Sequence, residues 1–136
     1  MAEVEVDSSS GAVSVRRVVC AQDMGLCVNP EGSAIQMEGC ITMGLGYALT
    51  EEIYFKGGEI FDSNFDTYEI PKFSWLPKIE TVIVENNSAA PQGCGESAIV
   101  TMGAALANAI YDACGARVYR LPMTPERVKE AIVAVR

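Results

Sequence analysis

The sequence contains no histidine, and this absence removes several kinds of chemistry at once. Ser-His and Cys-His catalytic pairs need an imidazole base, and many metal sites need imidazole ligands. Basic residues are also few, with 10 Lys and Arg against 18 Asp and Glu, which gives a formal net charge of -8. No basic stripe is present that could neutralise the phosphates of a nucleic acid. Acid–base chemistry in this chain must therefore rest on a carboxylate, a lysine, a tyrosine or a bound cofactor.

The cysteines follow no pattern of a disulfide framework or a metal site. Their number is odd and no Cys-x-x-Cys spacing occurs, so no metal ligand is predicted. No apolar run reaches the roughly 18 residues needed to span a bilayer, and no signal-peptide pattern follows Met1. We therefore expect a cytoplasmic protein that binds neither membrane nor nucleic acid. The five cysteines are Cys20, Cys27, Cys40, Cys94 and Cys114.

Length and periodicity predict one α+β domain over residues 1–136, in which helices pack on a mixed sheet. Alternating valines before residue 20 predict a hairpin, and apolar runs predict further strands at residues 79–84 and 118–121. The turn Gly57-Gly58 predicts a second, short hairpin. Two long buried helices and a C-terminal helix complete the predicted fold. The C-terminal helix should start at the capping pair Thr124-Pro125.

The first long helix is predicted over residues 30–49, capped by Asn29 with Pro30 in its first position. The second is predicted over residues 97–114 and should end at Gly115. Glycines inside the first helix suggest that another backbone or a ligand comes close. Two apolar stripes predict that this helix is buried nearly all round. They are Ala34, Met37, Ile41, Leu45 and Ala48, and Gln36, Cys40, Met43 and Tyr47; the glycines are Gly39, Gly44 and Gly46.

Residues 63–76 are predicted to be irregular, and they carry Tyr68, Pro71, Phe73 and Trp75. Two interpretations of these aromatic side chains stay open. They close the edge of the core, or they contact a substrate, since long loops without secondary structure of their own are often functional.

The phrase Gly93-Cys94-Gly95-Glu96-Ser97 is the most informative stretch for chemistry. Two glycines permit a sharp turn and a close approach of a ligand to the backbone. The helix that follows presents unpaired N–H groups and the positive end of its dipole. Glu96 at this junction either favours the dipole, an effect of about 0.3–1 kcal/mol, or is aimed at whatever the loop surrounds. A P-loop is excluded, because no Gly-Lys-Ser/Thr follows the glycines.

Gln36 is the second candidate site residue, in the first turns of a glycine-rich helix. A buried amide is costly unless it is paired. Gln36 therefore either bonds a neighbouring loop carbonyl or contacts a ligand, and its position in the sequence leaves both possibilities open.

Distinctive phrases run in order along almost the whole chain. They are residues 2–7, Gly11-x-Val13, Val18-Val19-x-Ala21-x-Asp23-x-Gly25, Asn29-Pro30, Gln36-x-Glu38-Gly39, Gly44-x-Gly46-x-Ala48-Leu49, Tyr68-x-Ile70-Pro71, Gly93-x-Gly95-Glu96, residues 107–110, and Gly115-x-Arg117-Val118-x-x-Leu121-Pro122-x-Thr124-Pro125-Glu126. This ordered set resembles the C-terminal part of the large, molybdopterin-binding subunit of the xanthine dehydrogenase/aldehyde oxidase (molybdenum hydroxylase) family. Several phrases in order are far more specific than a single glycine motif.

The resemblance implies an oxidoreductase that hydroxylates a purine-like N-heterocycle or an aldehyde, with water as the oxygen source. It implies that Glu96 is the general base and that Gln36 contacts the pterin dithiolene of a molybdenum–pterin cofactor. The phrases that match also make Gly39, Gly93, Cys94 and Gly95 cofactor-binding candidates. Iron–sulfur and FAD groups are expected on partner subunits or domains and not on this chain.

The family's large subunit is several times longer than this chain, so the resemblance implies a C-terminal fragment of a molybdenum-cofactor-binding domain. We expect the chain to act together with the remainder of the large subunit, and activity of the isolated chain is not expected. The alternative is a catalytically silent structural or interaction fragment that keeps the fold without the cofactor. Three positions depart from the family pattern: Ser97 replaces a common proline, Met43 a common glutamine, and Cys40 a small Gly or Ala.

Overall fold

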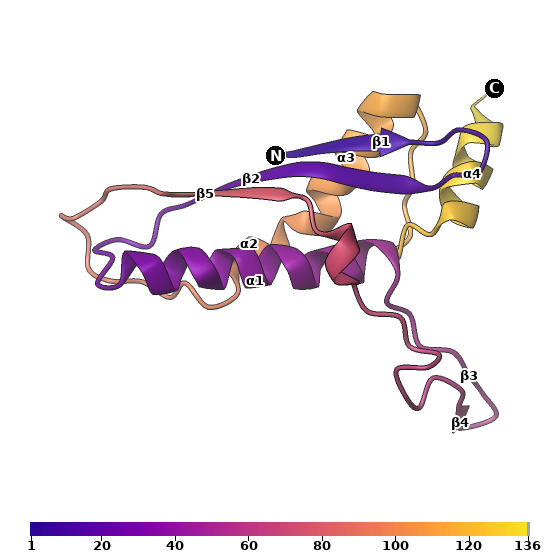
Figure 1. Cartoon of the computed structure of the whole chain (residues 1–136), viewed down its shortest axis with the longest axis horizontal. Helices are drawn as coiled ribbons and strands as arrows, with labels where there is room; N and C mark the ends of the chain where they lie inside the picture. Colours follow the sequence, from indigo (N-terminus) through magenta and orange to yellow (C-terminus); the bar gives the residue numbers. More distant parts are fainter. Residues whose placement is uncertain (136) are drawn as a thin grey trace.

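A computed structural model describes residues 1–135 and contains a three-stranded sheet with helices on one side (Figure 1). Strand β1 (Ala2–Val6) pairs antiparallel with β2 (Val13–Gln22), and β2 pairs parallel with β5 (Lys78–Ile83), so the sheet is mixed as predicted. The order of the strands is β1-β2-β5. Alternation of inward and outward side chains along β1 and β2 is what produces the half-buried hairpin.

Helix α1 (Pro30–Leu49) starts where the sequence predicts. The Asn29 side chain accepts a hydrogen bond from the Gly32 N–H at 3.0 Å, and Pro30 occupies the first turn, where its missing N–H costs nothing. Its first apolar stripe packs into the core, with Met37, Ile41 and Ala48 fully buried.

The predicted second stripe of α1 is largely exposed, so the prediction that this helix is buried on all sides is wrong. Cys40 is buried, but Gln36, Met43 and Tyr47 face outward. The sheet and the other helices cover one side of α1, and no further layer among the described residues covers the other. Burial of a helix face depends on which elements pack against it, and periodicity alone does not determine that.

The predicted helix over residues 97–114 is divided at Thr101 into α2 (Ser97–Val100) and α3 (Met102–Cys114). The Thr101 hydroxyl donates to the Ala98 carbonyl at 3.1 Å, a local bond that competes with the regular helical pattern. The combined stretch is long and apolar enough to pass a composition test for a membrane span, with a mean hydropathy of 1.2. One face of α3, with Met102, Leu106 and Ile110, is buried in the core, while 22% of the whole stretch from Ser97 to Cys114 is buried.

Two other predicted ends are confirmed and one predicted strand is wrong. Gly115 ends α3 with φ of 75°, a left-handed conformation that glycine adopts freely. Thr124 caps α4 (Pro125–Ala134), whose Val128 and Ile132 are buried. Residues 118–121 form no strand. A strand needs a neighbour that accepts its hydrogen bonds, and the described sheet has none beside this segment.

Residues 52–72 form an arm that leaves the body of the molecule after α1 (Figure 1). The predicted short hairpin is present as β3 (Phe55–Lys56) and β4 (Glu59–Ile60). A 3-10 helix, η1 (Phe73–Trp75), follows the arm. Phe73 is 90% exposed, so it does not close the core edge; Trp75 is only partly exposed. Many large apolar side chains of the arm are exposed: Ile53, Tyr54, Phe55, Ile60, Phe61, Phe65 and Ile70.

Glu52 connects the base of the arm to the segment around α4. Arg127 donates two hydrogen bonds to its carboxylate, at 2.7 and 2.9 Å, and Arg120 donates a third at 2.8 Å. These bonds, chiefly those from Arg127, lower the pKa of Glu52 from 4.5 to about 2. The Arg127 side chain also donates to the Pro122 carbonyl at 2.8 Å, so the pair is built into the fold.

The first prediction concerns two glycines of α1. A Cβ on Gly44 would lie 2.6 Å from Cγ and 2.7 Å from Cβ of Met102, whereas a Cβ on Gly39 would meet nothing within 4 Å. Gly39→Ala should therefore stabilise the chain by about 0.5–1 kcal/mol through helix propensity. Gly44→Ala should destabilise it by about 1–3 kcal/mol through overpacking. Urea unfolding of both variants checks this, and equal effects would contradict the described helix crossing.

The second prediction concerns acid stability. Because the pKa of Glu52 is lowered to about 2, its contribution is present above the ordinary value of 4.5 and is lost as the pH falls toward 2. Glu52→Gln should therefore lower the urea midpoint at neutral pH and flatten the decline between pH 4.5 and 2. Glu59→Gln, in the exposed strand β4 of the arm, is the control and should leave the pH profile unchanged. Parallel profiles for wild type and Glu52→Gln would show that the pair contributes nothing.

Candidate functional site

The Gly93–Ser97 loop leads into α2, and Glu96 occupies the residue before the helix. The Glu96 side chain is exposed and accepts no capping hydrogen bond from the helix, although the Glu96 carbonyl accepts the Ile99 N–H at 3.2 Å. The carboxylate is therefore not used to cap α2. It lies on the surface of a loop, where it can accept a proton from a bound molecule.

Two donors from α1 hold this loop in place. The Gln36 amide donates to the Gly95 carbonyl, and the Cys40 thiol donates to the same oxygen at 3.1 Å. Gln36 and Cys40 are four residues apart, so they lie one above the other on the same face of the helix. Of the two possibilities for Gln36, the bond to a neighbouring loop carbonyl is the one present. Its amide oxygen is not used in that bond and stays available for a ligand.

The two glycines near Glu96, Gly93 and Gly95, have free space where a side chain would otherwise be. A Cβ on Gly93 or on Gly95 would meet no atom within 4 Å, and the same holds for Gly39 on α1. Within residues 1–135 the N–H groups of Gly93, Cys94 and Gly95 donate no hydrogen bond. Unpaired N–H groups on a glycine loop suit an electron-rich ligand. The sequence predicts that another backbone or a ligand comes close to the glycines of α1. Side chains come close to Gly44 and Gly46, but no protein atom does so at Gly39.

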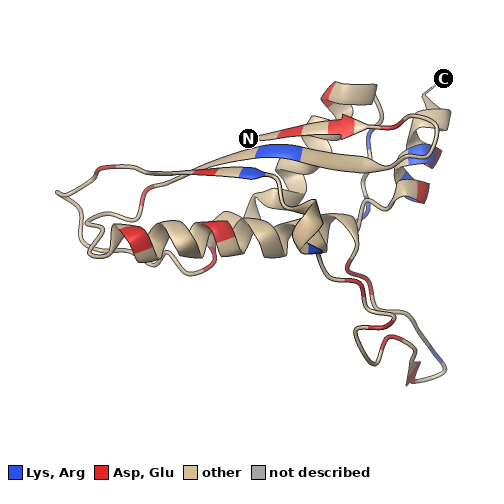
Figure 2. Cartoon of the chain, viewed as in Figure 1, with Lys and Arg blue, Asp and Glu red and all other residues tan. Residues whose placement is uncertain are grey.

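Charge around the loop is negative or absent. Residues 18–55 and 79–116, which include α1 and the whole loop, contain no Lys or Arg. Figure 2 shows acidic positions along α1, while basic positions lie on the sheet, in the arm and around α4. An anionic ligand at this loop would thus be held by backbone dipoles of this chain and not by its charged side chains.

The predicted site residues are brought together by α1 and the loop. Gln36, Gly95 and Glu96 share one region, linked by the bond between the Gln36 amide and the Gly95 carbonyl. The Cys94 thiol is half-buried and turns inward, 3.8 Å from the Ser33 hydroxyl. Cys94 therefore can offer a ligand its backbone N–H, while its side chain belongs to the interior.

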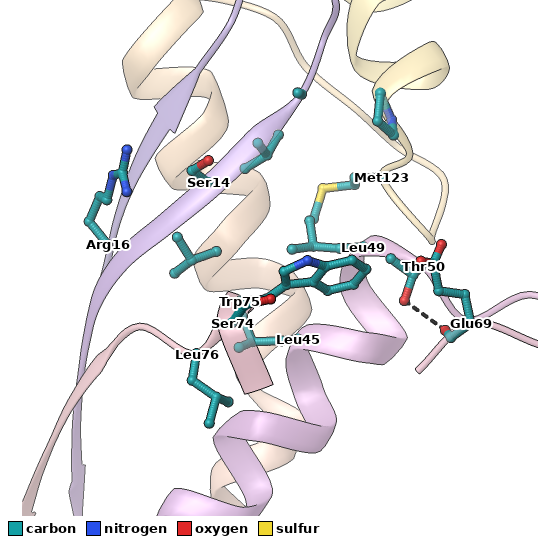
Figure 3. A pocket seen from close by; sticks show the side chains of 14 residues that line it. Ser14, Arg16, Leu45, Leu49, Thr50, Glu69, Ser74, Trp75, Leu76 and Met123 are labelled. Carbon is teal, nitrogen blue, oxygen red and sulfur yellow. Dashed lines mark hydrogen bonds between the residues drawn. The ribbon is translucent and has the colours of Figure 1, made fainter. Parts of the chain in front are cut away.

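A cavity of about 410 Å³ lies elsewhere, at the other end of α1 (Figure 3). It is bounded by residues 12–16 of β2 and its approach, by η1 with Trp75, and by Leu45 and Leu49. The helix residues that line it, Leu45 and Leu49, lie toward the C-terminal end of α1 from Gln36 and Cys40, and no residue of the Glu96 loop lines the cavity. Residues before Arg17 in β2 pair with β1 but not with β5, which leaves one backbone edge free there.

Gln22 is a polar residue that the sequence pattern did not single out. It ends β2 at 8% exposure, and both its amide nitrogen and its amide oxygen are buried without a hydrogen-bond partner among the described residues. Leaving such a group unpaired costs about 1–3 kcal/mol. The sequence signal that could have identified Gln22 is a glutamine at an inward-facing position of a valine-rich strand.

Comparison with known proteins identifies related sequences along nearly the whole chain. Residues 1–77 match the family model described as the molybdopterin cofactor-binding domain. A subunit of the nicotinate dehydrogenase of Pseudomonas putida is 39% identical over 97% of this chain, which covers 11% of that protein. The aldehyde oxidoreductase molybdenum-binding subunit PaoC of Escherichia coli is 33% identical over 96% of this chain, which covers 19% of it.

Solved structures show the same fold. The aldehyde oxidoreductase from Desulfovibrio desulfuricans superposes with a TM-score of 0.82 at 35% identity, over 94% of this chain and 14% of that one. The aldehyde oxidoreductase from Desulfovibrio gigas superposes with a TM-score of 0.86 at 31% identity, over 97% of this chain and 15% of that one. The chain thus spans between about a tenth and a fifth of these relatives.

The bond between Gln36 and the Gly95 carbonyl generates the third prediction. Gln36→Ala should destabilise the chain by about 0.5–1.5 kcal/mol and should speed hydrogen exchange of the amides of residues 93–99. The matched control is Gln92→Ala, because the Gln92 amide donates only to the carbonyl of Ala90, two residues away. Exchange measured by mass spectrometry checks this. Identical exchange in both variants would mean that α1 does not hold the loop.

Proposed function

This chain belongs to the molybdopterin cofactor-binding domain family, and from that premise we propose that it is the part of a molybdenum hydroxylase large subunit that supplies the catalytic base, Glu96. The observation that carries the proposal is an exposed carboxylate, free of any capping bond, on a glycine loop with open backbone. The relatives' names place them among oxidoreductases that act on nicotinate and aldehydes.

The residues present fit a molybdenum–pterin cofactor at this loop. Gly39, Gly93 and Gly95 leave room on both the helix and the loop, and the free N–H groups of residues 93–95 are donors for its electron-rich atoms. The Gln36 amide oxygen is an additional acceptor beside the loop. When bound, this cofactor supplies the redox chemistry that transfers oxygen from water to an electron-poor carbon.

In this proposal the chain's own residues do three things. Gln36 and Cys40 hold the Gly95 carbonyl and so fix the direction in which the loop presents Glu96. The glycines let the reacting centre approach the backbone. Glu96 removes one proton from the oxygen nucleophile, a role that requires it within about 2.6–3.2 Å of that oxygen.

No Lys or Arg occurs in residues 18–55 or 79–116, so any cationic contact to the cofactor's phosphate would come from outside these segments. This supports a division of the cofactor site between this chain and the remainder of the large subunit. The exposed apolar side chains of the arm further support a covering partner, since soluble proteins seldom leave large apolar patches bare. Iron–sulfur and flavin modules would carry the electrons away.

The substrate class follows from the same site. A carboxylate base that works on an electron-poor carbon suits N-heterocycles and aldehydes alike, and we infer a substrate of one of these two classes. Residues 18–55 and 79–116, which include α1 and the loop, contain no Lys or Arg, so these segments supply no cation that would select an anionic substrate. Any such selection would be made by the rest of the enzyme, in the cytoplasm.

The fourth prediction tests Glu96 in the native complex, captured from source cells through a tag on this chain. Glu96→Gln should lower kcat by about 100-fold or more, the usual effect of losing a general base. Molybdenum content, measured by mass spectrometry, should stay near one per chain, because an amide of nearly the same size replaces the carboxylate and leaves the bonds that hold the loop intact. The control is Glu130→Gln on α4, which should keep full activity.

Two other outcomes would contradict the proposal. If the captured complex contains molybdenum and Glu96→Gln retains activity, Glu96 is not the base. If no molybdenum is captured with a folded chain, the fold is a structural or interaction element whose site residues are idle.

A further inference from the structure

Four of the five cysteines gather in one small apolar cluster next to the Glu96 loop. The buried members of the cluster are Met24, Met37, Cys40 and Ala98, and Cys20, Cys27 and Cys94 pack against them. Cys114 lies apart, against the main core. All five are free thiols in this structure. Thiols packed in one cluster are candidates for disulfide formation when two of them can reach each other.

Two of these thiols lie on loops that are held side by side. The Leu26 N–H donates to the Ala89 carbonyl at 3.0 Å, and the Gln92 N–H donates to the Met24 carbonyl at 2.8 Å. Gly25, with φ of 66°, allows this approach, because a Cβ there would lie 2.2 Å from the Ala90 oxygen. The segment with Cys27 and the segment with Cys94 are therefore neighbours by backbone contact.

The hydroxyl of Ser33 lies between the two thiols. Its oxygen is 3.3 Å from the Cys27 sulfur and 3.8 Å from the Cys94 sulfur, within hydrogen-bonding range of both. Ser33 is buried in the first turn of α1, where its N–H donates to the Asn29 carbonyl at 3.0 Å. A fixed hydroxyl thus holds both sulfurs near one point.

We propose that Cys27 and Cys94 form a dithiol that closes to a disulfide on reaction with a peroxide. The thiolate of one cysteine attacks the peroxide O–O bond, which yields a sulfenic acid and one water from hydrogen peroxide. The second sulfur then displaces the sulfenic oxygen, which leaves as a second water. Two electrons pass from the sulfurs to the peroxide and one S–S bond forms.

Closure requires the sulfurs to reach about 2.05 Å, with the Cβ atoms about 3.8 Å apart. The movement can come from the Gly93 side of Cys94, away from the held Gly95 carbonyl, because a Cβ on Gly93 would meet nothing within 4 Å. Both thiols are half-buried, so a small oxidant can reach them.

The other two thiols of the cluster are poorer partners. Cys20 lies in β2, where it pairs with Thr81 of β5, and burial raises the pKa of its thiol, which lowers the fraction of reactive thiolate. Cys40 is fully inside α1, and its thiol already donates to the Gly95 carbonyl. Neither can shift without disturbing a regular element.

The new bond would link the loop of Glu96 covalently to the segment with Cys27, which precedes α1. The disulfide can form whether or not the proposed function is correct. Only an effect of the disulfide on turnover would rest on the proposed function. The disulfide is therefore detected by thiol alkylation and peptide mapping of the full chain, and not by an activity assay.

The fifth prediction concerns this bond. After treatment with hydrogen peroxide and alkylation of the remaining thiols, two of the five cysteines should be protected, and dithiothreitol should restore them. Trypsin cannot locate the bond, because residues 18–55 contain no Lys or Arg. Cleavage at acidic residues can, since Asp23, Glu31 and Glu38 separate Cys20, Cys27 and Cys40. The peptides of Cys27 and Cys94 should appear cross-linked.

Variants sharpen the result. Cys27→Ser should abolish the cross-linked peptide, and Cys114→Ser, which changes a thiol against the other core cluster, should keep it. Hydrogen exchange of residues 93–96 should slow in the oxidised wild type, which distinguishes closure of the native loop from scrambling in an unfolded chain. The proposal is overturned if all five thiols stay alkylatable, or if Cys94 pairs with Cys20, Cys40 or Cys114 instead.

Discussion

The crossing of α1 against α2 and the start of α3 is the contact on which the candidate site depends. Gly44 lets the two backbones come close enough for Met102 to fit between them. Four and eight residues earlier on the same helix face stand Cys40 and Gln36, both bonded to the Gly95 carbonyl. One row of residues along α1 therefore sets the packing of α3 and the position of the loop that presents Glu96.

This row also explains how much of the structure could be predicted from the sequence. Helix ends were predictable because their signals are local: Asn29 with Pro30, Gly115, and Thr124 with Pro125 each act within one turn. The strand at residues 118–121 and the full burial of α1 were wrong. Both depend on neighbours that a local pattern does not specify, namely a partner strand and a covering layer. The break at Thr101 lies inside an otherwise helical pattern, where the Thr101 hydroxyl bonds the Ala98 carbonyl, and no periodic signal marks it.

For the site, chemistry was easier to predict than geometry. Glu96 was singled out by the glycines around it, and the family resemblance, not the spacing, gave it a role. The bond between Gln36 and the Gly95 carbonyl joins residues far apart in the sequence, so only the fold reveals that this amide is paired with a loop carbonyl. Gln22 was overlooked because a single polar residue in a valine-rich strand carries no periodic signal, although its buried, unpaired amide stands out in the structure.

The parallel pairing of β2 with β5 has a consequence for the order in which the chain folds. Arg17 pairs with Lys78, so everything between them, including α1 and the whole arm, must be looped out before this ladder can close. Such long-range closure is slow, whereas the hairpin of β1 and β2 and the turns of α1 form from nearby residues. The loop of Glu96 follows β5 and rests on α1 through bonds that also join residues far apart in the sequence, so we expect it to form with the long-range contacts and not with the local ones. A partly folded chain would thus have most of its local structure and none of its site.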